Sequence, residues 1–442
     1  MVSGVTEKIK ALREALRALR NRNYRLFFIG QGISLIGVWM QTIAVGWLVY
    51  RMTRSEMMLG IVAFAGQAPV FFLSPFAGVI GDRFDRRRIL VIMQVLALLQ
   101  ALTLAILTFS GAVRVWHVVL LGAVLGLVNA FEMPTRQAFV VELVDARSDL
   151  PNAIALNSAL FTGARLIGPA MAGLIVVAAG EGACFLANAA SYPAALVALL
   201  MMSIPRREEP RSGGKLLPEL KEGLAYAFGF PPIRALLAVI GLLSLTSMSF
   251  PVLLPAFASE ILHGGPNTYG FLVAASGVGA LGGTLFLAMR KSVLGLERVI
   301  SISLVFFGIV LGVFSFSRFA PLSMAILALV GFWMILTMAS CTTILQTIVE
   351  EKKRARVMGL YVMVFMGAAP LGSIIAGGVS TAIGPPLTIL AAGGVSVIGG
   401  LVFARRVPVF RRLMRPIYHK MGIIPEVAIG IQTSEELQTP PE

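Results

Sequence analysis

A short segment rich in glycine and arginine contains the residue types and spacing that point most directly to a mechanical function. It runs Gly78-Val-Ile-Gly-Asp82-Arg83-Phe-Asp-Arg86-Arg-Arg. Gly78 would let two helices touch, and the partial positive charge at a partner helix N-terminus would stabilise the Asp82 carboxylate. Arg83 and Arg86 would tie the segment to Glu132. We interpret these five residues as a latch between two rigid bodies; the alternative is a plain basic membrane anchor.

Arg165 is a basic residue in the middle of a long apolar segment, 152–179. Charges inside a membrane are costly and usually face a cavity or a partner, so Arg165 is a candidate substrate contact. The alternative role is structural, with the guanidinium bonding backbone carbonyls near Gly163 or Pro169. Four polar residues in apolar segments are further cavity candidates, although bonding between helices is their commoner use: Gln31, Gln41, Asn129 and Asn188.

Small residues and proline surround Arg165 and favour close helix packing and a kink. They are Gly163, Gly168, Pro169 and Gly173. No carboxylate lies deep in the first apolar segment, and Glu132 is the acid that we predict to protonate near the membrane, close to its edge.

The elements that must position these residues are predicted from the composition. Hydrophobic residues make up 57% of the 442 residues and charged residues only 13%, against about 25% charged in soluble domains. The mean hydropathy is +0.85. A membrane-spanning helix needs about 20 apolar residues, and twelve segments reach or approach that length: 26–50, 57–80, 89–110, 115–133, 152–179, 183–203, 235–258, 268–289, 297–316, 320–344, 357–380 and 385–404. The predicted class is therefore an all-α membrane protein with twelve transmembrane helices.

The basic residues give the chain an orientation. The net charge is +15, but the charges form short clusters between apolar segments, which argues against nucleic-acid binding. With a cytoplasmic N-terminus, 32 of the 37 Lys and Arg residues fall on the cytoplasmic side. Because cytoplasmic loops are enriched in Lys and Arg, we predict a multi-pass protein of the cytoplasmic (inner) membrane with both termini inside.

The sequence also predicts two related halves. "LGIVAFAG" (59–66) and "YGFLVAASG" (269–277) lie about 210 residues apart. Parallel six-helix halves with a binding site between them are a recurring transporter design. The predicted boundaries are 1–203 for the first half, 204–232 for a cytoplasmic linker with an amphipathic helix, 233–405 for the second half and 406–442 for a cytoplasmic tail.

Several of these segments resemble one family. Residues 78–88, "GVWMQTIAVGWLVYRMT" (37–53), "NAIALNSALFTGARLIGPAMAG" (152–173) and "KRARVMGLYVMVFMGAAPLG" (353–372) are similar to the major facilitator superfamily, in the secretion-effector branch that includes the enterobactin exporter. The resemblance implies two pseudo-symmetric six-helix bundles. It implies that Asp82 docks on the start of the eleventh helix in the outward-open state. It also relates 163–173 to the antiporter signature of drug exporters.

The resulting expectation is a secondary transporter that exports a small organic molecule, siderophore-like or drug-like, by alternating access with protons as the coupling ion. We expect a monomer in the lipid bilayer, with no catalytic residues, metal or cofactor. One alternative is a non-transporting assembly or sensor protein on the same fold. A membrane-embedded enzyme is the other, and the isolated His117, His263 and His419 argue against it.

Overall fold

The computed structural model describes residues 16–144, 149–203, 225–290 and 292–420, and the side chains of 74–83, 351, 352, 355 and 420 lie outside the described part. Within these ranges the secondary structure is helical throughout. The helices are η1 (Arg17–Arg20), α2 (Arg22–Thr53), α3 (Glu56–Arg83), α4 (Arg86–Phe109), α5 (Val115–Glu142), α6 (Leu150–Met201), α8 (Pro231–Ser247), α9 (Ser249–Ala256), the π-helix η3 (Phe257–Ile261), α10 (Pro266–Ala288), α11 (Leu296–Phe316), α12 (Ala320–Ile348) and α13 (Glu351–Lys420).

Ten helical stretches in the described ranges are long and apolar enough to cross a membrane. Two of them contain two crossings each, because glycines with positive φ interrupt them. Gly180 (φ 79°) divides α6, and Gly384 (φ 81°) divides α13. Both sit in the left-handed region that favours glycine. The described chain therefore makes twelve crossings, which confirms the predicted fold class.

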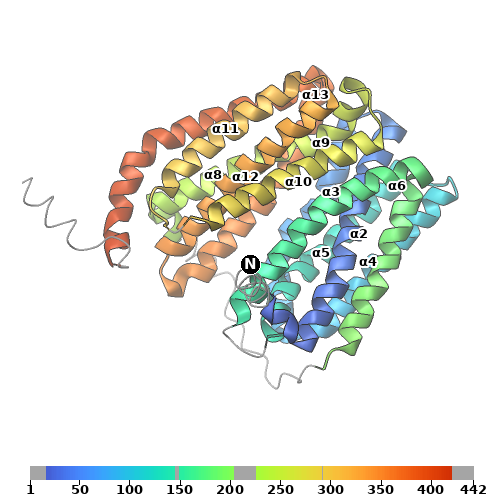
Figure 1. Cartoon of the computed structure of the whole chain (residues 1–442), viewed down its shortest axis with the longest axis horizontal. Helices are drawn as coiled ribbons and strands as arrows, with labels where there is room; N and C mark the ends of the chain where they lie inside the picture. Colours follow the sequence, from blue (N-terminus) through green and yellow to red (C-terminus); the bar gives the residue numbers. More distant parts are fainter. Residues whose placement is uncertain (1–15, 145–148, 204–224, 291, 421–442) are drawn as a thin grey trace, which may run out of the picture.

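The crossings form two groups, which Figure 1 shows as blue-to-green helices on one side and yellow-to-red helices on the other. In the first group α2 packs on α6 and α3 on α5; in the second α10 packs on α12 and α11 on α13. The groups meet where α3 packs on α13 and α6 on α10. The first crossing of each half is followed by a non-glycine residue with positive φ, Arg54 (49°) and His263 (50°). The two halves therefore share this backbone conformation as well as their helix order.

Two helices continue beyond the segments predicted to cross the membrane. The fourth crossing was expected to end at 133, but α5 continues to Glu142. The last was expected to end at 404, with a tail from 406, but α13 continues to Lys420. Its extension is helical because one face is apolar at helical spacing and packs against the core; the buried residues are Phe403, Val407, Phe410, Met414 and Tyr418. Most of the expected amphipathic helix, 204–224, lies outside the described residues.

For reference, the basic end of the molecule is the end at which α2, α4 and α11 begin and α13 finishes. The opposite end is marked by Arg54, Gly180 and Gly384. Both native cysteines are fully buried between these ends, Cys184 in α6 and Cys341 in α12.

Candidate functional site

The predicted latch segment lies at the basic end, where α3 finishes and α4 begins. Gly78, Asp82 and Arg83 belong to the last turns of α3, but their side chains lie outside the described part. Asp85 caps α4, since its carboxylate accepts a hydrogen bond from the Arg88 backbone N–H at 3.1 Å. The docking of Asp82 therefore stays a prediction.

The predicted ion pair between Arg86 and Glu132 is not formed. Arg86 pairs with Glu142 at 2.6 Å. Glu132 instead accepts from Gln94 at 3.3 Å and lies 3.6 Å from Arg136. The reason is the length of α5: Glu142 ends that helix beside the start of α4, whereas Glu132 lies about 15 Å deeper along the axis.

Glu132 is consequently more deeply placed than expected. The residue is 8% exposed, and its carboxylate has only Arg136 as a basic partner among the described residues. Two neighbouring polar atoms, Gln94 Oε1 and Thr135 Oγ1, are buried without a hydrogen-bond partner in the described chain. The polar cluster around Glu132 is therefore incompletely hydrogen-bonded within the described chain.

Two of the candidate cavity residues are committed to helix packing instead. Gln41 Nε2 donates to Gln100 Oε1 at 3.0 Å, and Asn188 Nδ2 donates to Gln41 Oε1 at 2.8 Å. All three residues are buried. This network joins α2, α4 and α6. Gln41 and Asn188 therefore form hydrogen bonds between helices, which is the commoner use of polar residues in membrane helices. Gln31 and Asn129 bond to no described residue and stay candidates.

Arg165 lies midway between Leu150 and Gly180, at the centre of its crossing. Its guanidinium carbon is 5.8 Å from the ring centroid of Trp39 in α2, a cation–π distance. Phe161, one turn away on α6, meets the same indole edge-on at 6.0 Å. The side chain is half-buried, and Nε is buried with no hydrogen-bond partner in the described chain.

The structural alternative for Arg165 finds no support in these contacts. The guanidinium bonds neither the carbonyls near Gly163 nor those near Pro169, and no described carboxylate pairs with it. Arg165 is thus a membrane-embedded cation whose partner is an aromatic ring. It retains hydrogen-bond donors for a further, acceptor-bearing molecule.

The halves pack together from the opposite end down to the level of Arg165. A Cβ at Gly173 in α6 would lie 2.9 Å from Cα of Asn267 in α10, and one at Gly277 in α10 would lie 3.5 Å from the Arg165 carbonyl oxygen. Gly168 packs instead on Trp39 within the first half. Gly163 lies nearer the basic end and does not have the predicted packing role, because a Cβ there would have no neighbour within 4 Å.

A second pair of helices closes the same end. A Cβ at Gly60 in α3 would lie 2.7 Å from the Ser373 carbonyl oxygen in α13. One at Gly377 would lie 2.6 Å from the Glu56 carbonyl oxygen and 3.2 Å from Gly60 Cα. Only glycine permits so close an approach of two backbones.

Polar contacts between the halves reinforce this closure. The Tyr50 hydroxyl at the end of α2 donates to the Glu260 carboxylate at the end of η3. Arg54 donates to the Ser259 hydroxyl at 3.2 Å and lies 5.3 Å from the Tyr50 ring centroid. The sequence analysis did not predict this contact. Its one signal was the separation of Tyr50 and Glu260 by 210 residues, which is about the repeat offset.

The sequence analysis also did not identify Trp39 or Arg136 as site residues. For Arg136 the one available signal was its spacing of four residues from Glu132, which places both on one face of a helix.

Comparison with known proteins agrees with this architecture. The chain is 27% identical over 352 residues to the staphyloferrin A transporter of Staphylococcus aureus (strain NCTC 8325 / PS 47), covering 79% of this chain and 88% of that one. It is 25% identical over 383 residues to the multidrug efflux pump Tap of Mycolicibacterium fortuitum, covering 84% and 91%.

A solved structure shows the same fold. It is the inward-facing, occupied form of a bacterial homologue of the human lysosomal transporter Spinster, with a TM-score of 0.66 and 14% identity over 90% of this chain and 98% of that one. The model of the transmembrane secretion effector family matches residues 14–428. Nearly the whole chain is thereby accounted for, and it belongs to the transmembrane secretion effector family, a family of major facilitator superfamily transporters and not of enzymes.

Proposed function

We propose that this multi-pass membrane transporter exports a small organic molecule by alternating access, in exchange for protons. The observation that carries the proposal is the close packing of the two halves at the opposite end, in the part of the chain that the structure describes. Glycine contacts join α6 to α10 and α3 to α13 at the opposite end, and at α6 they reach no further than Arg165. A rigid-body rocking that breaks these contacts and closes the basic end would carry a central molecule across.

Glu132 supports exchange for protons. It is the buried acid of the first half whose ion partner, Arg136, sits on the same helix at 3.6 Å. Protonation would release Arg136 and change the polar contacts of α5 with Gln94 on α4. A proton on Glu132 would thus favour one arrangement of these helices over another, which is what coupling requires.

Arg165 supports a class of substrate. Its fixed positive charge lies at the centre of a low-dielectric region, where Coulomb attraction is much stronger than in water. No described acid neutralises it, so a neutral molecule with acceptors or an organic anion fits here better than a lipophilic cation. Siderophores and acidic drugs are such molecules, and two of the relatives are named as a staphyloferrin A transporter and a multidrug efflux pump.

We propose that the basic end faces the cytoplasm, with both termini inside and the protein in the cytoplasmic membrane. The Lys and Arg residues at this end support the proposal. We expect a reporter fused after Glu442 to be active only if it functions in the cytoplasm. Paired fusions of a phosphatase that requires export and a fluorescent protein that requires the cytoplasm measure this. Phosphatase activity at the C-terminus would contradict the assignment.

The transport proposal is tested with the purified protein in proteoliposomes. We expect uptake of a labelled siderophore or dye into inverted vesicles to rise when the lumen is acidified, because protons leaving would drive substrate entry. An uncoupler should remove the stimulation without changing binding. Flux that is unaffected by the proton gradient would contradict antiport, and the absence of flux for neutral and anionic compounds alike would contradict the substrate class.

A further inference from the structure

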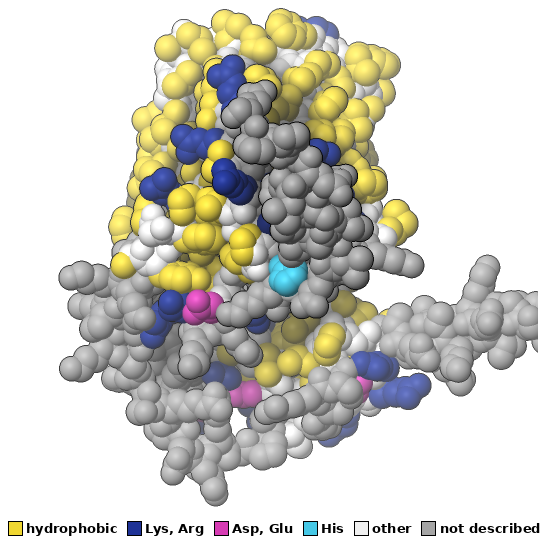
Figure 2. Space-filling view, turned by 90° about the vertical axis from the view of Figure 1, so that its left-hand side faces the viewer, with side chains coloured by type: hydrophobic (Ala, Val, Ile, Leu, Met, Phe, Trp, Pro, Cys, Tyr) yellow, Lys and Arg dark blue, Asp and Glu magenta, His cyan; other side chains and the backbone are white. Residues whose placement is uncertain are grey.

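Arg165 has a hydrogen-bond donor that no described residue uses. Its Nε is buried and has no hydrogen-bond partner in the described chain, and the residue lies at the centre of its crossing. Exposed basic side chains, such as those standing among hydrophobic ones in Figure 2, keep their charged ends in water and need no protein partner. A buried donor without an acceptor is rare in folded proteins. The Nε edge of Arg165 is therefore available to an acceptor on a bound molecule.

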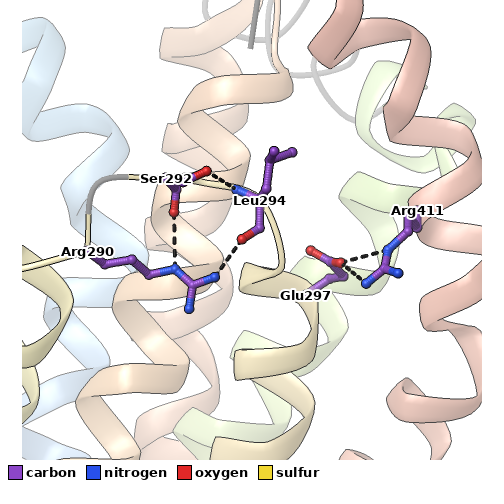
Figure 3. Close-up of polar contacts among 5 residues, drawn as sticks. All are labelled: Arg290, Ser292, Leu294, Glu297 and Arg411. Atoms are coloured by element: carbon purple, nitrogen blue, oxygen red, sulfur yellow. Dashed lines mark hydrogen bonds and ion pairs between the residues drawn. The ribbon is translucent and has the colours of Figure 1, made fainter. Parts of the chain in front are cut away.

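Two other arginines show what this edge binds in the same protein. Arg411 donates to the Glu297 carboxylate from Nε at 3.0 Å and from Nη2 at 2.7 Å, as Figure 3 shows. Arg51 donates to the Glu181 carboxylate from Nε at 2.7 Å and from Nη2 at 3.2 Å. Both acids are buried. In each case the Nε–Nη2 edge of a guanidinium group holds a carboxylate that is withdrawn from water.

Trp39 holds the guanidinium of Arg165 in place. The guanidinium carbon lies over the indole, and Phe161 meets the indole from the side. Gly168 brings the two helices close together, because a Cβ there would lie 2.5 Å from the Trp39 Cβ. Contacts from α6 thus fix the ring, and the ring face attracts the cation. Trp39 is a positioning residue, since it acts on a bound molecule through Arg165.

Trp39 also places this pair between the two halves. On α2 it lies on the same face as Gly46 and Tyr50, about two and three helical turns away. The Tyr50 hydroxyl donates to a carboxylate of the second half, and a Cβ at Gly46 would lie 2.8 Å from the Tyr269 hydroxyl in α10. Trp39 continues this face toward the basic end. A molecule bound to Arg165 beside it therefore lies between the halves, where both can contact it.

We propose that Arg165 and Trp39 together recognise a carboxylate group of the transported molecule. The two carboxylate oxygens accept from Nε and Nη2 of Arg165, as the Glu181 carboxylate accepts from Arg51. Trp39 keeps this edge turned toward the space between the halves. The inference rests on the proposed transport function and narrows its substrate class, from neutral acceptors and organic anions in general to carboxylic acids.

The charge of the site selects a carboxylate over other acceptors. An amide or ester oxygen can accept a hydrogen bond but leaves the guanidinium charge unbalanced in a low-dielectric region. A doubly ionised phosphate or phosphonate leaves one negative charge unbalanced instead. A carboxylate carries a single negative charge and two oxygens on one carbon, which match the charge and the fork of one guanidinium group.

Binding of a panel of organic acids, each compared with its primary amide, tests this inference. Calorimetry on the full-length protein in neutral detergent, at a pH where the acids are ionised, measures the affinities without a proton gradient. We expect the acids to bind about tenfold or more tightly than their amides, the effect of hydrogen bonds to a charged group. The phosphonic acid of the same skeleton should bind less tightly than the carboxylic acid.

Variants of Trp39 test its positioning role. Trp39→Leu should lower the acid-to-amide affinity ratio about tenfold, and Trp39→Phe should retain most of the ratio because it keeps a ring face. In Arg165→Gln the ratio should fall to about one, and adding Trp39→Leu should change it no further, since coupled residues are not additive. Trp116→Leu removes an exposed indole from α5 and is the matched control. The Trp39 variants keep the test decisive if Arg165→Gln does not fold.

Four results would overturn this inference. They are equal binding of acids and amides, binding of neither, an unchanged ratio in Trp39→Leu, and an equal fall in Trp116→Leu. Because no gradient is used, these results are separate from the test of transport. Flux without proton dependence would contradict antiport and leave carboxylate recognition intact, whereas equal acid and amide binding by a protein that does transport would contradict carboxylate recognition alone.

Discussion

Arg165→Ala is expected to weaken binding of the transported molecule about 10- to 100-fold, the range for a lost hydrogen bond to a charged group. The guanidinium stands over Trp39 without a described acid to neutralise it. Its removal would take the fixed positive charge from the centre of α6, so anionic compounds should lose the most affinity. Lipophilic cations should lose none.

Arg165→Lys separates charge from geometry in this test. Lysine keeps the charge but lacks the planar fork of donors that stacks on an indole, so we expect it to restore little affinity. Binding is measured by fluorescence quenching or calorimetry on variants that elute as a single species. Arg51→Lys, in an ion pair with Glu181 far from Trp39, is the matched control. Unchanged affinity in folded Arg165→Ala protein would reject the substrate role.

Gly377→Leu is expected to reduce transport about tenfold or more by holding the two halves apart at the opposite end. Its Cβ would lie 2.6 Å from the Glu56 carbonyl oxygen, and this neighbour is backbone that cannot rotate away. Such overpacking costs about 1–3 kcal/mol. Because the cost falls only on the arrangement with this end closed, the population shifts toward the other one.

Gly378→Leu is the control for this experiment. A Cβ at Gly378 meets only the Met57 sulfur at 3.8 Å, an ordinary contact. The state of the opposite end is measured as the rate at which Asn267→Cys reacts with a membrane-impermeant maleimide. The two native thiols are fully buried and should not compete. We expect faster labelling with Gly377→Leu and no change with Gly378→Leu; equal rates in the two would contradict the closure described for α3 and α13.

Much of the fold followed from the sequence because membrane helices are specified by simple physical rules. Apolar length fixes a crossing, and glycine in the left-handed region fixes a turn such as those at Gly180 and Gly384. The extension of α13 escaped prediction for a related reason. Residues 405–420 are too charged to read as a crossing, and their apolar face, with Phe410 and Met414, has meaning only beside α11.

The candidate site was harder to predict because polar side chains inside a helix bundle choose partners in three dimensions. Gln41 and Arg165 both looked like cavity residues in the sequence. Gln41 turned out to bond Gln100 and Asn188, which required the relative rotation of three helices. Arg165 met Trp39, a residue without any charge to signal the pairing. Arg86 was assigned to Glu132 and pairs with Glu142 instead, because the apolar pattern underestimated the length of α5.

The contact between Tyr50 and Glu260 has a consequence for the origin of the molecule. The two positions are 210 residues apart, about one repeat, so each lies at or beside the counterpart of the other. In a twofold homodimer of a six-crossing ancestor, a contact on the axis joins two identical side chains. Two glutamates there would repel each other, and two tyrosines would lack the strong carboxylate acceptor. A donor facing an acceptor near the axis is open only to two copies that differ in sequence, so this contact is one that a symmetric homodimer could not make.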